Sequence, residues 1–294
     1  MHPNPGKIEE IASDVFALIW SEDDSVYGGY GANQGFVILE NSVLLFDSGL
    51  TLVQARQLEK EVRRVSDKKI RYLVNSHDHS DHVFGNSFFW NKYFSAGLRI
   101  LSHRVCRDNM VSLGPKRLVR YSKIAGLRAS LQQVRIREPD VTYSDPGLRI
   151  DLEGTNFVFV HPPTGAHTLG DTLLYLPDKK AIFAGDIVWN RFMPNLEDAN
   201  IEGWISFLDE LDLSICKKIV PGHGKVCGPN TVFAFREYLQ LVRSNLMKVD
   251  LAKTSRRDRN LLKSCFMTQE TDDWKLRSII HHNVDTILVR RSGT

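Results

Sequence analysis

The chain has 294 residues, of which 42% are apolar and 25% charged, the composition of an ordinary globular protein with room for a sizeable core. The net charge is only +3 with histidine neutral, which argues against a nucleic-acid binder, because such proteins usually carry a strongly basic face. No apolar run reaches 18 residues and the first residues show no apolar signal segment, so we expect neither a membrane span nor secretion.

The first predicted elements are short strands and one helix. Strands are expected at residues 15–20, 35–40 and 42–47, with a tight hairpin between the last two. Thr51 can cap a helix that runs to about Ser66 and has one apolar side. A strand at 70–75 follows and leads directly into a run of histidines.

The alternation of strands and helices then continues. A helical stretch is expected at 104–133, broken near Gly114 and Pro115, and a helix at 201–211. After Pro229 the chain is predicted to be mainly helical, from Thr231 to about Lys253 and then more weakly. Further strands are predicted at 98–101, 148–152, 156–160, 172–176, 181–184 and 218–220. This alternation favours helices packed outside β-sheet.

The strongest chemical signal is at residues 77–82, which read His-Asp-His-Ser-Asp-His. In an extended chain His77 and His79 point the same way, and Asp81 and His82 can aim back at the same pocket from the start of a helical turn. Imidazole nitrogen and carboxylate oxygen suit zinc and related divalent ions. Gly85 permits close backbone packing behind this motif.

Three later residues share the setting of this motif. His167 lies in a turn between two predicted strands, Asp186 follows Ala-Gly after a strand, and His223 lies in Gly-His-Gly after another strand. A single histidine or aspartate in a loop usually has no special role. Three of them beside glycine at the ends of apolar strands, where α/β proteins place their sites, are predicted to join the motif at 77–82.

Together these features resemble the metallo-β-lactamase-fold superfamily of hydrolases. Its marks are an HxHxDH motif, a later histidine after a strand, an aspartate after glycine and a final histidine in Gly-His-Gly, and all occur in this order within about residues 10–228. Residues 46–49, Phe-Asp-Ser-Gly, also resemble the family's early Asp-x-Gly turn. The resemblance implies an α/β fold, a four-layer αββα sandwich. It implies a catalytic domain at 1–228 and a mainly helical C-terminal extension at 229–294 packed on it.

The resemblance also implies a dinuclear metal site. Asp47 would not bind an ion itself but would orient a ligating histidine, although it could instead simply cap a turn. The expected cofactor is two Zn²⁺ per chain, with iron or manganese tolerated by these ligand types. Seven side chains are the implied ligands, in three groups: His77, His79 and His167 on one ion; Asp81, His82 and His223 on the second; and Asp186 bridging both.

A water shared between two dications is acidified towards neutrality, so a bridging hydroxide would be available at physiological pH. Asp81 could both ligate an ion and steer this hydroxide as a catalytic residue. We therefore expect a metal-dependent hydrolase that cleaves an ester, lactone, thioester or amide (β-lactam-like) bond in a small molecule. The alternatives are an iron-dependent redox enzyme similar to persulfide dioxygenases and a scaffold that binds metal without turnover. The complete ligand set argues against the scaffold.

Departures from particular branches narrow the choice. Metallo-β-lactamases with a cysteine ligand carry it where Asp186 stands, and β-CASP nucleases need a large insertion between Asp186 and His223 that is missing here. Flavodiiron proteins carry a glutamate where His79 stands. The layout is similar to glyoxalase II, but a basic glutathione-binding pattern near the C-terminus is not evident. The missing β-CASP insertion and the small net charge argue against nucleic acid as a substrate.

The remaining expectations concern substrate, assembly and location. Arg191 could pair with a substrate carboxylate, whereas His103 and His161 are interpreted as structural. An apolar stripe at 239–249 could pack on its own domain or form a homodimer. A group of aromatic residues could form an apolar substrate wall or be part of the core: Trp20, Tyr27, Tyr30, Phe88, Phe89 and Trp90. The four cysteines form no Cys-x-x-Cys pair, which together with the missing signal segment suggests a cytoplasmic protein.

Overall fold

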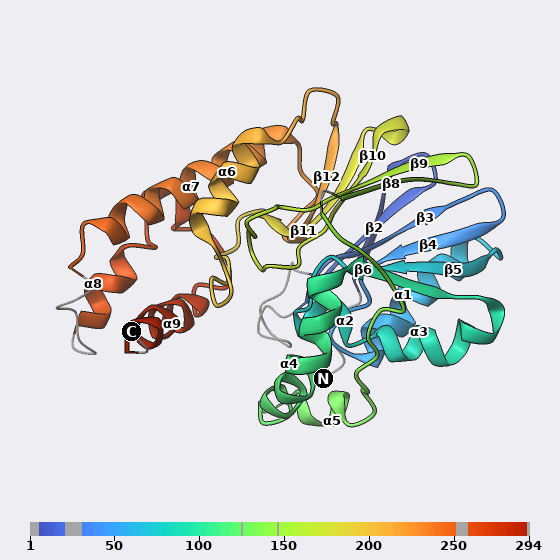
Figure 1. Cartoon of the computed structure of the whole chain (residues 1–294), viewed down its shortest axis with the longest axis horizontal. Coiled ribbons are helices and arrows are strands. Elements are labelled where there is room, and N and C mark those ends of the chain that lie inside the picture. The colour runs from blue at the N-terminus through green and yellow to red at the C-terminus, as the bar shows by residue number, and fades with distance from the viewer. Residues whose placement is uncertain (1–5, 21–30, 125, 146, 251–257, 293–294) are drawn as a thin grey trace.

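The computed structural model describes residues 6–20, 31–124, 126–145, 147–250 and 258–292. In these residues the strands form two sheets that pack face to face, and helices cover the outer side of each sheet (Figure 1). The four-layer αββα sandwich expected from the sequence is confirmed. No helix in the described ranges is long and apolar enough to cross a membrane.

The first sheet brings the ends of several parallel strands to one edge. Its strands pair in chain order, antiparallel as far as β4 and parallel from β4 to β7. Because β4 and β5 are parallel neighbours, Asp47 after β4 lies beside the segment that follows β5. The strands are β1 (Lys7–Ala12), β2 (Val15–Ile19), β3 (Gln34–Ile38), β4 (Ser42–Phe46), β5 (Lys69–Val74), β6 (Arg99–His103) and β7 (Val141–Tyr143).

The second sheet supplies the other half of the same edge. Its order is β12-β11-β10-β9-β8, antiparallel except for the parallel pair of β11 with β12. The β9–β10 loop carries His167, while Asp186 and His223 lie within the last parts of β11 and β12. The strands are β8 (Gly147–Leu152), β9 (Thr155–Val160), β10 (Leu173–Leu176), β11 (Ala181–Trp189) and β12 (Lys218–His223).

Helices α1 (Leu52–Val65) and α3 (Asn86–Tyr93) cover the first sheet. Thr51 caps α1 as predicted, in a reciprocal pair with Gln54 that satisfies backbone amides at the helix start. The apolar side of α1 includes Leu58 and Val62, which are fully buried against the sheet. Burying a side chain of this size contributes roughly 1.5–3 kcal/mol, so the amphipathic pattern determines which face of the helix packs inward.

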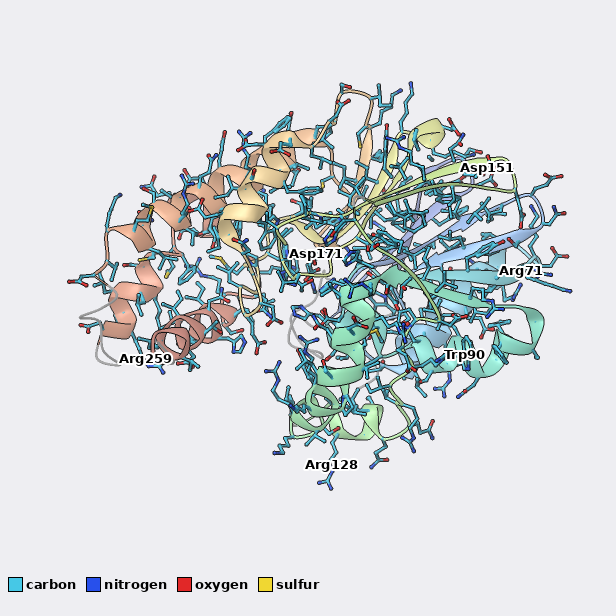
Figure 2. All side chains as sticks on the ribbon, viewed as in Figure 1. Arg71, Trp90, Arg128, Asp151, Asp171 and Arg259 are labelled. Atoms are coloured by element: carbon cyan, nitrogen blue, oxygen red, sulfur yellow. The ribbon has the colours of Figure 1, made fainter. Side chains whose placement is uncertain are left out.

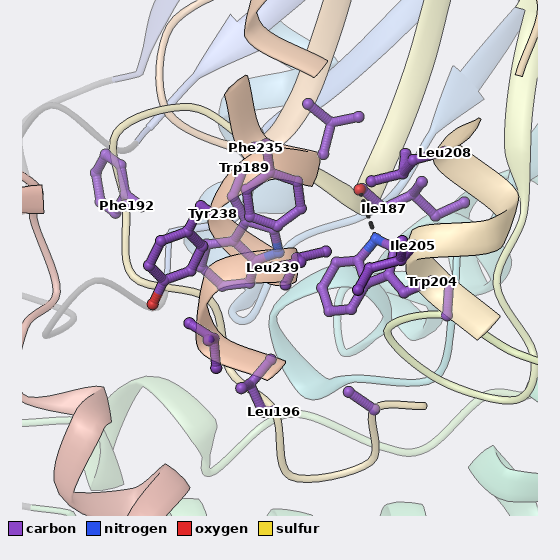
Figure 3. Close-up of a cluster of buried hydrophobic side chains, with 14 of the residues drawn as sticks. Ile187, Trp189, Phe192, Leu196, Trp204, Ile205, Leu208, Phe235, Tyr238 and Leu239 are labelled. Atoms are coloured by element: carbon purple, nitrogen blue, oxygen red, sulfur yellow. Dashed lines mark hydrogen bonds between the residues drawn. The ribbon is translucent and has the colours of Figure 1, made fainter. Parts of the chain in front are cut away.

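The second sheet packs against α6 (Ile201–Glu210) and α7 (Pro229–Met247), followed by α8 (Arg259–Ser264) and α9 (Ile279–Ser292). Figure 3 shows this core, in which Trp204 of α6 donates its indole N–H to the carbonyl of Ile187 at 2.9 Å. Phe235 of α7 and Val284 of α9 belong to the same buried cluster. The helices after residue 228 therefore share a core with β11, while the domain boundary at 228 stays a prediction.

Several elements differ from the sequence-based expectation. Helix α4 (Arg104–Tyr121) continues through Gly114 and Pro115, where a break was predicted, and that prediction was wrong. Strand β11 extends through Asp186 to Trp189, and β1 and β7 were not predicted. The short helices of the described chain are α2 (Ser80–Val83), α5 (Arg128–Leu131) and 3₁₀ turns at Phe94–Ala96, Pro177–Lys179 and Gln269–Thr271.

Candidate metal centre

The motif at 77–82 bends where an extended segment meets a one-turn helix. After β5 the chain stays extended to His79, which is the N-terminal cap residue of α2 (φ −69°, ψ 147°). Asp81 and His82 lie in the first turn of α2 and therefore face back toward the histidines before it. All seven predicted ligands are buried, and none is more than 8% exposed.

Four of these side chains meet in a first cluster, formed by His77, His79, His167 and Asp186. One ligand atom from each lies within 4.8 Å of the others. Nδ1 of His79 is 2.9 Å from Nε2 of His167, which is 3.2 Å from Oδ2 of Asp186. Nε2 of His77 lies 3.9 Å from the same oxygen.

The second cluster contains Asp81, His82 and His223, whose ligand atoms also lie within 4.8 Å of one another. Nε2 of His223 is 3.3 Å from Oδ2 of Asp81. Oδ1 of Asp186 faces this group, 3.1 Å from Nε2 of His82 and 3.6 Å from Nε2 of His223. The two oxygens of one carboxylate thus point into different clusters.

The chemistry of these atoms fits divalent cations. Nε2 of His77 is buried and lacks a hydrogen-bond partner among the described residues. Nε2 of His82 and Oδ1 of Asp186 are buried too, and although they lie 3.1 Å apart they form no hydrogen bond. Buried polar atoms are normally satisfied, so such atoms in the middle of a histidine and carboxylate cluster point to an ion as their partner.

Lowered pKa values favour ion binding at several of these ligands, because an imidazole or a carboxylate binds a cation in its deprotonated form. Burial and the surrounding histidines hold the pKa of His77 well below its usual range, and burial lowers the pKa of His167 to about 3. Burial alone would raise the pKa of Asp186, but His82, His223 and His167 lower it below its ordinary value. Burial acts to lower the pKa of His82, but Asp186, Asp47 and Asp81 raise it well above normal. Loading an ion at His82 should therefore release a proton.

Asp47 lies directly behind the second cluster. Its Oδ2 accepts a hydrogen bond from Nδ1 of His82 at 2.7 Å, which leaves Nε2 of that ring turned toward Asp186. The carboxylate also accepts from the backbone N–H and the hydroxyl of Ser76, both at 2.8 Å. This contact with a histidine of the motif supports the orienting role expected from the sequence over simple turn capping.

The predicted substrate contacts are only partly near the clusters. Arg191 forms an ion pair with Asp273 at the rim of a recess of about 520 Å³, beside Trp189. Phe88, Phe89 and Trp90 pack with α1 and the first sheet, so they do not form a substrate wall, and Trp20 packs against the same core. Tyr27 and Tyr30 lie outside the described residues. His103 and His161 stack on each other away from the seven ligands, with ring centroids 3.8 Å apart.

The space over the clusters is small. A cavity of about 30 Å³ is lined by Asp81, Asp186 and His223, with Arg117 and Arg120 of α4 on one side. Leu276 and Ile279 of the C-terminal segment line it as well. This volume holds no more than a few water molecules.

Sequence reasoning missed two residues that contact the motif. Asp198 lies 2.9 Å from Nε2 of His79, and Arg117 bonds to both Asp198 and Asp78. Neither Asp198 nor Arg117 lies in or next to a recognisable sequence motif. Only the adjacent acids Glu197 and Asp198 in a chain segment near the predicted ligand Asp186 could have drawn attention.

Comparisons with known proteins agree with this geometry. The family model described as "Metallo-beta-lactamase superfamily" matches residues 27–223. A linear primary-alkylsulfatase from Pseudomonas sp. is 25% identical over 213 residues, which cover 62% of this chain and 39% of that protein. The acyl-coenzyme A thioesterase MBLAC2 from Homo sapiens is 24% identical over 230 residues, covering 74% and 81%.

A solved structure extends the likeness to nearly the whole chain. The stereoselective inverting sec-alkylsulfatase Pisa1 from Pseudomonas sp. superposes with a TM-score of 0.72 at 16% identity, covering 97% of this chain and 50% of that one. This chain therefore spans about half or less of the two sulfatases it resembles, and the likeness to Pisa1 establishes the fold alone.

Proposed function

We propose that this chain, which belongs to the metallo-β-lactamase superfamily, is a metal-dependent hydrolase that uses two zinc ions to cleave an ester, lactone, thioester or amide bond in a small molecule. The observation that supports this proposal best is the position of Asp186. Its two carboxylate oxygens face the two clusters separately, at 3.2 Å from His167 and 3.1 Å from His82. A carboxylate placed in this way suits two ions held side by side.

The proposed ligands are those expected from the sequence. His77, His79 and His167 would hold one ion, and Asp81, His82 and His223 the other, with Asp186 shared. When bound, two such ions supply Lewis acidity and an acidified water, and thus a hydroxide nucleophile at neutral pH.

Asp81 has the additional role of orienting the nucleophile. Its carboxylate lines the small cavity and lies 3.3 Å from His223. Burial alone would raise the pKa of Asp81, but His82 and His223 lower it below its usual value, so the group is ionised near neutral pH. An ionised carboxylate in the cavity wall accepts a hydrogen bond from water and so directs the lone pair of that water toward the substrate.

The recess beside Trp189 suggests where a larger part of the substrate would lie. Trp189 lines both this recess and the small cavity, and its ring stacks on His223 with centroids 4.3 Å apart. Phe235, Tyr238 and Trp274 add further aromatic surface, and Arg191 lies at the rim. Since the proteins named above are two alkylsulfatases and an acyl-coenzyme A thioesterase, esters with an apolar chain belong in the first set of substrates tested.

A substrate panel tests the reaction. Purified protein loaded with zinc should hydrolyse at least one member of a series of chromogenic lactones, thioesters, lactams, phosphodiesters and alkyl sulfates. His79→Ala, which removes one proposed ligand, should lose this activity. Hydrolysis that survives in His79→Ala would show that the activity comes from another site or from a contaminant.

Metal analysis separates the proposal from its alternative. Protein purified without added metal and then exchanged against zinc should retain about two zinc ions per chain. One tightly held iron per chain with oxygen uptake on a thiol or persulfide would instead support a redox enzyme on the same fold. Nucleic acid and a second copy of the chain are not part of the proposed reaction.

A further inference from the structure

A carboxylate outside the seven proposed ligands reaches the first cluster through His79. Oδ2 of Asp198 lies 2.9 Å from Nε2 of His79, while Nδ1 of the same ring lies 2.9 Å from Nε2 of His167. One nitrogen of His79 therefore faces the cluster and the other faces Asp198. The arrangement parallels the pair of His82 with Asp47 on the second cluster, but Asp198 comes from a different part of the chain.

Arg117 fixes the position of this carboxylate. Its NH2 group donates to Oδ2 of Asp198 at 3.0 Å, and its NH1 group donates to the carbonyl of Asp78 at 2.9 Å and to the carboxylate of Asp78. Asp78 stands between His77 and His79 in the chain, so one guanidinium joins Asp198 to the backbone of the motif. The side chain of Arg117 is only 11% exposed, and a charge buried to this degree is held by its partners.

These contacts also determine the tautomer of His79. A carboxylate oxygen next to Nε2 stabilises the form in which Nε2 carries the proton, because a carboxylate can only accept a hydrogen bond. Nδ1 is then left with its lone pair directed at the cluster. An imidazole held in this form, with its ring fixed at the outer nitrogen, is a better ligand than one free to rotate or change tautomer.

We propose that Asp198 is a positioning residue for His79, held in place by Arg117, and that it strengthens binding of one of the two metal ions. The proposal rests on the proposed metal centre but not on the identity of the substrate. Its test is a metal affinity, so it can fail while the hydrolase assignment stands, or hold while no substrate is found.

The neighbouring residue provides a matched control. Glu197 is also an acid paired with an arginine of α4, since its carboxylate accepts from Arg120 at 2.9 and 3.2 Å and lies 3.0 Å from His282. None of these partners is among the seven proposed ligands. Glu197→Gln therefore disturbs a similar ion pair one residue away without touching His79.

The experiment measures zinc affinity by competition with a chromophoric chelator, using full-length protein stripped of metal. Asp198→Ala should weaken one of the two zinc equivalents by about 10–100-fold and leave the other within about two-fold of wild type. Asp198→Asn should have an intermediate effect, because its amide oxygen can still accept from Nε2. Asp47→Asn should weaken the other equivalent, and Glu197→Gln neither.

Cobalt substitution checks that the change is local. The visible absorption of the weakened cobalt equivalent should change in Asp198→Ala and return toward wild type in Asp198→Asn, while Glu197→Gln keeps the wild-type spectrum. The proposal is overturned if Asp198→Ala binds both equivalents with wild-type affinity, or if Asp198→Ala and Glu197→Gln weaken both equivalents to the same extent. The second outcome would indicate a general effect on folding.

Discussion

The position of Asp186 depends on a residue that has no side chain. Gly222 precedes the ligand His223 in β12, and a Cβ atom added there would lie 1.8 Å from Oδ1 of Asp186. The position of a Cβ atom is fixed by the backbone, so either the Asp186 carboxylate or strand β12 must move to remove this overlap. A glycine is thus required at position 222 because the Asp186 carboxylate lies so close to its backbone. The requirement does not come from backbone conformation, since the φ of Gly222 is not positive.

We therefore expect Gly222→Ala to lower zinc affinity and activity by at least about 10–100-fold, because a displaced Asp186 can no longer face both clusters. Metal content after dialysis and turnover of the best substrate measure the effect. Gly228→Ala is the control, since its Cβ would meet only the carbonyl oxygen of Lys217 at an ordinary 3.8 Å. Equal zinc retention by the two variants would contradict the argument.

The buried carboxyl of Asp171 should make the stability of the fold decrease as the pH rises. This carboxyl is buried in the loop that carries His167 (Asp171 is labelled near the centre of Figure 2) and accepts from the N–H and hydroxyl of Thr168 at 2.8 and 2.7 Å. Burial raises its pKa to about 7 against the lowering effect of Thr168. Between about pH 4 and 7 the folded protein therefore holds a proton here that the unfolded chain has lost. Stability falls as pH rises through this window.

Asp171→Asn removes this titration. The stability of the variant relative to wild type should increase from pH 4.5 to pH 8, by at most about 1.4 kcal/mol per pH unit. Urea denaturation of the metal-free proteins across this range measures the difference. A constant offset between the two curves would mean that the Asp171 carboxyl does not titrate with a raised pKa.

At the scale of single elements, α4 begins at a histidine cap. Nδ1 of His103 accepts from the backbone N–H of Val105 at 3.4 Å, which requires a neutral ring. Burial and then His161 lower the pKa of His103 to about 4. Since this value lies below the 6.5 of an ordinary histidine, the stabilising contribution is complete above pH 6.5 and is lost as pH falls toward 4.

His103→Asn should therefore lose less stability on acidification than wild type, because asparagine caps a helix without titrating. The midpoint of thermal unfolding is measured for both metal-free proteins from pH 7.5 to 4.5. The midpoint of the variant should fall less than that of wild type as the pH is lowered. The lost stacking on His161 gives an offset that does not vary with pH. Parallel curves would rule out a titrating cap.

The elements also show what local sequence can predict. Helix α1 was predicted with its cap because Thr51, Gln54 and the apolar spacing act within a few residues of each other. Strand β1 was missed because most of its residues are at least partly exposed and its apolar alternation is weak. The helix continues through Pro115 because contacts distant in the chain, such as Arg117 with Asp78 and Asp198, stabilise the turn that follows it.

Some residues of the candidate site can likewise be predicted from local sequence, and others cannot. The motif at 77–82 and the glycine-flanked His167, Asp186 and His223 are each recognisable locally, and the structure brings all seven side chains together. Asp198 contacts His79 across 119 positions of the chain, and nothing in its own neighbourhood specifies that contact. Residues that support a site from behind are therefore harder to predict than its ligands.

At the scale of the whole molecule, the C-terminal segment completes the site. In Figure 1 the helices after β12 lie to the left of the sandwich, yet the chain before α9 returns to the loop after β11. Lys275 forms backbone hydrogen bonds with Arg191 and Met193, both at 3.0 Å. Asn283 of α9 bonds to Leu196 and Pro194, each at 2.9 Å. These contacts hold Leu276 and Ile279 over the cavity.

With a cavity of about 30 Å³, this segment limits which substrates reach the cluster. Ile279→Ala should raise the ratio of kcat/KM for a bulky ester to that for a small ester by roughly ten-fold, because the lost methyl groups line the cavity. Its neighbour Ile280 is also buried but does not line the cavity. Ile280→Ala should therefore cost about 2–5 kcal/mol of stability, as Ile279→Ala does, without changing the ratio. Both variants are compared with wild type at a temperature where all three are folded. If the two substitutions changed the ratio equally, the effect would come from loosening of α9 as a whole, and Ile279 would have no direct part in substrate selection.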